Sequence, residues 1–376
     1  MSIYLDNAAT TQVCPEAVRA ALDAMTVHYG NPSSTHAPGR EAARLLEQAR
    51  GSVARALGCA PGELYFTSGG SEGDNWAVRC GALSRSRVGK HIVSSAAEHS
   101  AVLKTLAYLE SQGYAVTYLK PRPDGAVALA DVLGALREDT CLVSLMLVNN
   151  ETGAVTDVSG IAQAIRAQNP NTLIHTDAVQ AFLKVPFSAS SLGADLVTVS
   201  GHKVHAPKGV GALYIRGGLH LAPLIHGGGQ ERGLRAGTEP LPLIAAFGAA
   251  CEAALPTLAE DQARMAALRA HAAERLQAEN EMLRLIGGGA PQILSLSLPG
   301  WRSEVLMNCL EAEGISVSKS SACKKGGRSY VLEAMGLPAN VIDGALRVSF
   351  SRFSTMEEAD AFCAALTAAR KRLRHR

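Results

Sequence analysis

Short segments rich in β-branched residues alternate with helical patterns through the first two thirds of this 376-residue chain. Segments 91–95 (HIVSS), 172–177 (TLIHTD) and 195–200 (DLVTVS) have the length of buried strands, and stretches such as 71–84 and 159–168 repeat apolar residues at helical spacing. This alternation is typical of an α/β protein in which helices wrap a mainly parallel sheet. The tight connection after 195–200 favours antiparallel pairing with the next strand. Four more strands are expected at 63–68, 115–119, 140–148 and 211–215. Together with the three above, they make seven.

The pattern changes after about residue 255. An amphipathic stretch at 258–285 precedes a short strand at 292–298, a helix, a strand at 345–350 and a final helix from Met356. Such a mixture is typical of a second, smaller α+β unit. We therefore predict a large domain over residues 14–255 and a small domain formed by residues 1–13 and 256–376.

The composition excludes several classes of function. Hydrophobic residues make up 47% of the chain and charged residues 19%, with a formal net charge of +2. So small a charge gives no electrostatic reason to bind nucleic acid or an anionic membrane. No apolar run approaches the roughly 18 residues that span a bilayer, and the N-terminus lacks the pattern of a signal peptide. We expect a cytoplasmic protein with no direct nucleic-acid or membrane partner.

Polar residues follow the ends of several predicted strands. In a parallel sheet the carboxyl ends of the strands meet at one edge, where ligands bind. Lys203 stands there between two histidines, and Asp177 ends the strand at 172–177. A lysine lies most often in solvent, but at this edge its amine can form a Schiff base with a carbonyl group. The other polar residues at this edge are the Ser68–Ser71 turn, Glu98, His99, Asn149, Asn150, Glu151, Gln180, Ser200 and His202.

These side chains together fit one cofactor. Taken singly, each suits a turn or a helix cap. The Ser68–Ser71 turn opens a predicted helix, so its backbone amides also suit a phosphate. A Schiff-base lysine combined with an aspartate that keeps a ring nitrogen protonated is the arrangement that pyridoxal phosphate uses. The joint placement of Lys203 and Asp177 therefore predicts a pyridoxal phosphate site.

Eight cysteines are scattered along the chain and form no C-x-x-C pair. This spacing indicates neither a disulfide framework nor a metal site, and we predict none. Cys141 and Cys363 lie in apolar patterns and fit the core. Cys323 differs because it lies in SKSSACKKGGRS, a polar segment with lysines on both sides. Nearby positive charge lowers the pKa of a thiol, so we predict a reactive thiolate at Cys323.

Ten short motifs extend along nearly the whole chain. They are YLDNAATT (4–11), GNPSSTH (30–36), FTSGGSEGDN (66–75), EH (98–99), VNNETG (148–153), HTDAVQ (175–180), SGHKVHAPKGVGALY (200–214), HGGGQERGLRAGT (226–238), SSAC (320–323) and LRVSFSRF (346–353). In this order they resemble the cysteine desulfurases of the class V aminotransferase family, the group of iron–sulfur-cluster and nitrogen-fixation desulfurases. The resemblance implies the type I fold of pyridoxal phosphate enzymes, with a large and a small domain, and a homodimer.

The resemblance also implies roles for individual residues. Lys203 is expected to hold the cofactor and move the Cα proton, Asp177 to pair with the pyridine nitrogen, and His99 to stack on the ring and assist the substrate thiol. Cys323 is expected to accept the sulfur as a persulfide. The remaining implied contacts are Asn150 and Gln180 to the phenolic oxygen, Gly70, Ser71, Ser200 and His202 to the phosphate, Thr238 to the phosphate across the subunit boundary, and Arg347 with Asn31 and Asn150 to the substrate carboxylate.

The implied reaction converts L-cysteine to L-alanine and passes sulfur to an acceptor protein, such as a cluster-assembly scaffold or a tRNA-thiolation enzyme. Three alternatives stay open. A selenocysteine lyase uses the same chemistry, a class V transaminase needs no mobile cysteine, and a scaffold without catalysis needs neither Lys203 nor Cys323. One segment departs from the commoner pattern, because KKGGRSYVL follows Cys323 where relatives carry a longer loop that ends in Glu-Pro-Ser.

Overall fold

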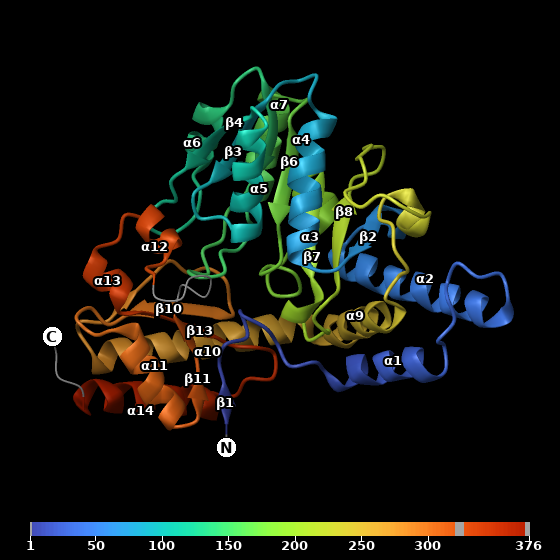
Figure 1. Cartoon of the computed structure of the whole chain (residues 1–376). Coiled ribbons are helices and arrows are strands. Elements are labelled where there is room, and N and C mark those ends of the chain that lie inside the picture. The colour runs from blue at the N-terminus through green and yellow to red at the C-terminus, as the bar shows by residue number, and fades with distance from the viewer. Residues whose placement is uncertain (1, 320–326, 373–376) are drawn as a thin grey trace.

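The computed structural model describes residues 2–319 and 327–372 (Figure 1). Its largest sheet has seven strands in the order β2-β8-β7-β6-β5-β3-β4. Only β8 runs antiparallel to its neighbours β2 and β7, and the other pairs are parallel. The predicted sheet and the antiparallel pairing at its end are confirmed. The strands are β2 (Leu64–Thr67), β3 (His91–Ser95), β4 (Ala115–Leu119), β5 (Thr140–Ser144), β6 (Leu173–Asp177), β7 (Leu196–Ser200) and β8 (Gly211–Ile215).

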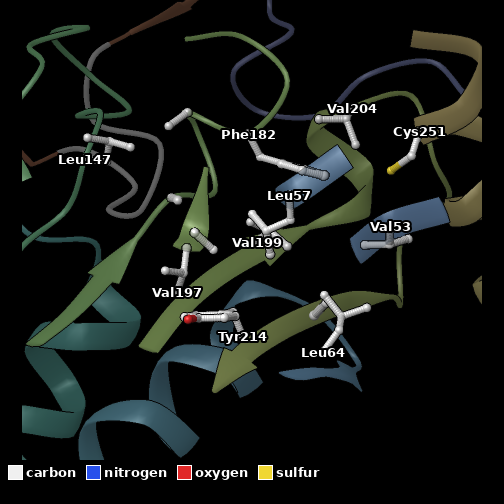
Figure 2. Packing of buried hydrophobic residues seen from close by; sticks show 14 of the residues in the cluster. Val53, Leu57, Leu64, Leu147, Phe182, Val197, Val199, Val204, Tyr214 and Cys251 are labelled. Atoms are coloured by element: carbon white, nitrogen blue, oxygen red, sulfur yellow. The ribbon is translucent and has the colours of Figure 1, made fainter. Parts of the chain in front are cut away.

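Both faces of this sheet are covered by helices, which explains why its central strands are apolar along their whole length. Successive residues of β7 point to opposite faces. Val197 and Val199 pack into the main core, where Figure 2 shows Val199 near Leu57, the last residue of α2 (Ala37–Leu57). Leu196 packs with Trp76 on the other side. The helices that cover the sheet are α3 (Gly70–Asn75), continued by a π-helical turn (Trp76–Cys80) and α4 (Gly81–Ser84), then α5 (Ser100–Ser111), α6 (Leu129–Ala135), α7 (Val158–Gln168) and α8 (Ala189–Leu192).

Strand β5 ends at Ser144, four residues before the end of the predicted strand at 140–148. The backbone remains bonded to β6, because the amide of Leu145 donates to His175 at 3.1 Å. On the other side the amide of Met146 donates to the carboxylate of Glu98 at 2.9 Å. The side chain of Glu98 therefore takes the place of a neighbouring strand and ends the regular ladder.

A second sheet of four strands has the order β12-β13-β10-β9. Strand β1 (Ile3–Tyr4) pairs in parallel with β11 (Ile315–Ser316) in a small sheet of its own. Leu296, Leu346 and Phe362 belong to a second apolar core. The domain boundaries at residues 14 and 255 stay a prediction. The elements of this part are β9 (Arg284–Leu285), β10 (Ile293–Ser297), β12 (Ser318–Lys319), β13 (Ala345–Ser349), α10 (Leu258–Glu279), α11 (Ser303–Ala312), α12 (Tyr330–Ala334), α13 (Ala339–Asp343) and α14 (Met356–Arg372).

Three helices pack together beside the edge of the large sheet that carries β2: α1 (Pro15–Thr26), α2 (Ala37–Leu57) and α9 (Leu241–Ala254). Among the described residues, the helical stretch Leu241–Glu279 is long and apolar enough, by length and composition, to cross a membrane. Its α9 part contacts α1 and α2 and buries most of its residues in the main core. Burial of this kind is that of a core helix, and it accounts for the apolar composition.

A buried ion pair fixes the loop at 226–238 to the large sheet. The two terminal guanidinium nitrogens of Arg50, Nη1 and Nη2, each donate to the carboxylate of Glu231 at 2.8 Å, and the side chains are only 4% and 2% exposed. Glu231 also accepts from the amide of Phe66 in β2 at 2.8 Å. Because both charges are removed from water, each depends on the other for compensation.

We expect Glu231→Gln to lower the free energy of unfolding by about 3–5 kcal/mol, because it removes the buried counter-charge of the Arg50 guanidinium and leaves only the exposed Glu47. The matched control is Glu47→Gln, since Glu47 binds the same arginine at 3.0 Å but is 62% exposed. That variant should lose at most about 1 kcal/mol. Urea unfolding of both variants measures the difference, and equal losses would contradict the analysis.

Candidate active site

A cavity of about 340 Å³ lies at the carboxyl ends of the parallel strands. Its position follows from the topology, because loops from β3, β5, β6 and β7 all leave the sheet at that edge. Residues of the second sheet and of the N-terminal segment complete its walls. The structure brings ten of the predicted site residues together here: Gly70, Ser71, His99, Asn150, Asp177, Gln180, Ser200, His202, Lys203 and Arg347.

Lys203 ends the 3-10 turn Gly201–Lys203, which follows β7 directly. Its Nζ donates to the carbonyl oxygens of Ala8 at 2.6 Å and of Ala9 at 2.7 Å. The N-terminal segment is held in place because the amide of Thr11 donates to the carbonyl of His202 at 2.9 Å. The amine of Lys203 therefore sits in a backbone cradle, at the wall of the cavity.

His202 lies beside this amine, and its Nδ1 lies 3.2 Å from the hydroxyl oxygen of Thr10. Burial lowers the pKa of His202 to about 4, and the charge of Lys203 acts in the same direction. The imidazole is therefore neutral at physiological pH, so it can donate a hydrogen bond without adding a charge.

Asp177 is the last residue of β6 and is buried. Its Oδ1 accepts from the amide of Val179 at 2.9 Å. Burial raises the pKa of Asp177, while the positive charge of His99 and of Lys203 opposes that rise. The amide of Val179 also opposes the rise, and a further cation in the cavity would stabilise the carboxylate.

Two more buried carboxyl groups lie near Asp177. Ligand atoms of Asp74, His99 and Asp177 all lie within 4.8 Å of one another. Burial first, and then the charge of Asp177, raises the pKa of Asp74 well above its usual range. Burial does the same for the pKa of Glu98. Burial therefore disfavours the ionised form of both groups. Asp74, His99 and Asp177 together could also ligate a metal ion. The absence of a metal therefore stays a prediction.

Three buried polar atoms point to a ligand with polar groups. Asn150 Oδ1, Gln180 Oε1 and Ser200 Oγ have no hydrogen-bond partner among the described residues. Such atoms are rare in folded proteins, and here all three belong to residues that line one cavity. Gly70 adds a steric requirement, because a Cβ on it would lie 2.9 Å from the side chain of Val179. These features fit a polar cofactor of the size of pyridoxal phosphate.

Arg347 comes from the second sheet, where it lies in the middle of β13. It is 2% exposed, and its guanidinium donates to Asp6 at 2.8 Å and to the carbonyl oxygen of Asn150 at 2.9 Å. Its Nε has no hydrogen-bond partner within the described ranges. A buried guanidinium at the wall of a cavity is suited to bind a carboxylate through two parallel hydrogen bonds.

Three predicted site residues are not in this group. Asn31 and Thr238 are exposed and do not line the cavity. Cys323 lies outside the described residues, which stop at Lys319 and resume at Gly327. Sequence reasoning also missed partners that the structure supplies. The carbonyl of Ala8 could not be predicted, because any residue type has a backbone carbonyl. Nothing in the sequence marked Asp74 as a site residue, although it lies in the motif FTSGGSEGDN.

Comparison with known proteins agrees with this geometry. The family model for class V aminotransferases matches residues 3–362. The chain is 42% identical to cysteine desulfurase 2 of Trichormus variabilis, covering 95% of this chain and 90% of the relative. It is 41% identical to the cysteine desulfurase IscS of Methanosarcina thermophila, covering 96% and 89%. A solved structure of a NifS-like protein superposes with a TM-score of 0.93 at 38% identity, covering 99% and 100%.

The chain belongs to the class V aminotransferase family, whose members use pyridoxal phosphate. Both curated relatives carry the name cysteine desulfurase. The predicted family and fold are thereby confirmed.

Glu151 connects the cavity to the second sheet. It follows Asn150, is buried, and accepts a short hydrogen bond from the hydroxyl of Ser329, which caps α12. Burial raises the pKa of Glu151 to about 7, against the opposing effects of Ser329 and of the charge of Arg347. An unfolded glutamate ionises near pH 4.3. Between these values the folded chain binds more protons than the unfolded chain, so stability falls as the pH rises to about 7.

Glu151→Gln should remove the loss of stability that comes from ionising a buried glutamate. Relative to the wild type, we expect the variant to gain roughly 2–3 kcal/mol of unfolding free energy between pH 5 and pH 8, because the wild type must ionise a buried group over that range. Urea unfolding at both pH values measures the gain. The control is Glu333→Gln, an exposed residue of the same helix α12. A gain that does not depend on pH would show that Glu151 is already ionised at pH 5.

Proposed function

We propose that the protein is a pyridoxal phosphate-dependent cysteine desulfurase that converts L-cysteine to L-alanine and transfers the sulfur to an acceptor protein. One observation carries the proposal: the amine of Lys203, the carboxylate of Asp177 and the unpartnered polar atoms of Asn150, Gln180 and Ser200 converge on one cavity. The names of the curated relatives support the choice of cysteine as substrate.

Pyridoxal phosphate, when bound, supplies a ring that withdraws electrons from the Cα atom of the substrate. In this proposal Lys203 anchors the cofactor covalently and moves the Cα proton, and Asp177 keeps the pyridine nitrogen protonated. His99 stacks on the ring. Asn150 and Gln180 bind the phenolic oxygen. The phosphate is held by Gly70, Ser71, Ser200 and His202.

The substrate carboxylate binds Arg347, with Asn31 and Asn150 beside it. Asp6 holds the guanidinium in position at 2.8 Å, so little reorientation is needed when the substrate arrives. The Cys323 thiolate then attacks the sulfur of the substrate. As the new S–S bond forms, the Cβ–S bond breaks and its electron pair stays on Cβ, which takes up a proton to become the methyl group of alanine. Cys323 keeps the sulfur as a persulfide until an acceptor thiol takes it.

The first experiment tests this assignment in two stages. The purified protein with pyridoxal phosphate should be yellow, and borohydride should fix the cofactor to Lys203. With cysteine and a reductant the wild type should release alanine and sulfide in equal amounts. Cys323→Ala should still show a spectral change on adding cysteine but should release neither product, because it lacks the attacking thiolate.

Cys59→Ala serves as the control, since Cys59 is a half-buried thiol that does not line the cavity. It should keep wild-type turnover. Wild-type turnover by Cys323→Ala would instead favour an elimination without a protein nucleophile, as in the selenocysteine lyase alternative. A colourless protein that takes up no cofactor would contradict the whole proposal.

We also propose that the active unit is a cytoplasmic homodimer. Three apolar side chains of α1 at helical spacing are exposed: Val18 (52%), Leu22 (59%) and Met25 (57%). Asn31 follows this helix, and it is exposed, as is Thr238. An apolar face beside two site residues that do not reach the cavity of their own chain suits a two-fold interface. Through it, Thr238 would complete the phosphate site of the partner subunit.

Leu22→Glu should convert the dimer to a monomer, because two copies of the buried charge would face each other across a two-fold axis. Sedimentation velocity measures the change. Cofactor affinity should fall with it, since Thr238 of the partner would be lost. Val305→Glu, on α11 and 41% exposed, is the control and should remain dimeric. A wild-type protein that is monomeric and binds the cofactor at full strength would exclude this arrangement.

A further inference from the structure

A second lysine lies behind Lys203. Lys184 follows β6 at a tight turn, is 6% exposed, and its Nζ has no hydrogen-bond partner among the described residues. Leu183, immediately before it, has a φ of 55°, a left-handed conformation that is strained for any residue except glycine. The chain keeps this strained turn at the point where it places an unpaired amine in the interior.

Lys184 and Lys203 line the same small cavity of about 30 Å³, and Lys203 also lines the large cavity. A space of this size can hold one water molecule. Both lysine residues therefore border a space that can hold a water molecule, and the charge of Lys203 acts on Lys184. Lys203 is the member of the pair that faces the proposed cofactor, and Lys184 lies on its far side.

Among the described residues that line the small cavity with Lys184, the one carboxyl group is bound to other side chains. The other charged or titratable residues of the small cavity are His205, Asp261 and Arg352. Asp261 accepts from Thr257 and Arg264, and Arg352 donates to the carbonyl of Ala253.

His205 is also neutral at physiological pH. Burial lowers the pKa of His205 to about 4, and its Nδ1 lies 2.8 Å from the carbonyl oxygen of Gln12. The small cavity thus contains two amines and no free carboxylate.

The two amines differ in how well they hold a proton. Burial, and then the charge of Lys203, lowers the pKa of Lys184 to about 7. Lys203, by contrast, donates to two carbonyl oxygens, which stabilise its ammonium form. These contacts favour a proton on Lys203, and Lys184 is the neighbouring amine with a lowered pKa that can take it.

We propose that Lys184 is a positioning residue that accepts the proton of Lys203, so that the catalytic amine becomes a nucleophile and a base inside a closed site. In this step an N–H bond of the Lys203 ammonium breaks and the lone pair of Lys184 takes the proton, with no other reactant. The inference rests on the proposed role of Lys203. Beyond that role, Lys203 does not have to exchange its proton with bulk water before each reaction.

The pH profile of Lys203 reactivity tests this pair. While two amines share one proton, the fraction of Lys203 that is neutral does not change with pH, because moving the proton between them neither takes up nor releases one. A lysine that titrates alone instead loses reactivity tenfold for each pH unit below its own titration.

The experiment is competitive acetylation of the full chain without cofactor, followed by peptide mapping. In the wild type, the rate at Lys203 should be nearly constant between pH 7.5 and pH 9. In Lys184→Met and Lys184→Gln it should fall about tenfold per pH unit over that range and be roughly tenfold below the wild type at pH 7.5. Lys208→Met, an exposed neighbour, is the control and should keep the flat profile.

A wild-type profile in both Lys184 variants would overturn the inference. If neither variant folds, as judged by circular dichroism, the titration of Lys184 in the wild type decides. By lysine carbon NMR it should titrate near pH 7, and about one pH unit higher in Lys203→Ala, because the like charge is gone. An unchanged titration in Lys203→Ala would also overturn it. Failure of the borohydride label at Lys203 would instead reject the proposed function, so the two failures are distinguishable.

Discussion

The N-terminal segment at residues 5–14 holds the two sheets together, and the candidate active site depends on that connection. The amide of Ser349 in the second sheet donates to Leu5 at 2.7 Å, and Asn7 donates back to Ser349 at 2.9 Å. A few residues further on, Thr11 bonds to His202 beside the large sheet. Between these two attachments lie the carbonyls that hold the amine of Lys203. The cavity thus has walls from two separate sheets because this one N-terminal segment is bonded to both.

The acidic side chains and the lysines of the site form two separate groups. Asp177 lies near Asp74 and Glu98, two buried carboxyl groups whose pKa values are raised by burial, and Lys203 shares a small cavity with Lys184, whose pKa burial lowers. Within each group one charge disfavours a second, because like charges repel strongly at low dielectric. Asp177 and Lys203 both line the large cavity, where a carboxylate suits a basic ring nitrogen and a neutral amine suits an aldehyde.

Much of this site could be predicted from the sequence, because strands with clear apolar patterns place their last residues at a common edge. Asp177 and Lys203 were predicted in this way, and the structure brings them to one cavity. Arg347 needed the resemblance to a family, since a buried arginine inside a strand has no local signal. The carbonyl of Ala8 and the amine of Lys184 were missed. A backbone acceptor has no sequence signature, and the burial of a lysine depends on packing between elements that are distant in sequence.

The chain on either side of Cys323 is attached beside the same cavity. Ser318 of β12 pairs with Arg347 in β13, so the segment starts next to the proposed carboxylate site. It returns at Ser329, bonded to Glu151, and at Tyr330, whose hydroxyl donates to the carbonyl of Glu98 at 2.7 Å. The described chain is therefore fixed beside the cavity on both sides of the segment that contains Cys323, which is where the proposed persulfide step requires a thiol to act.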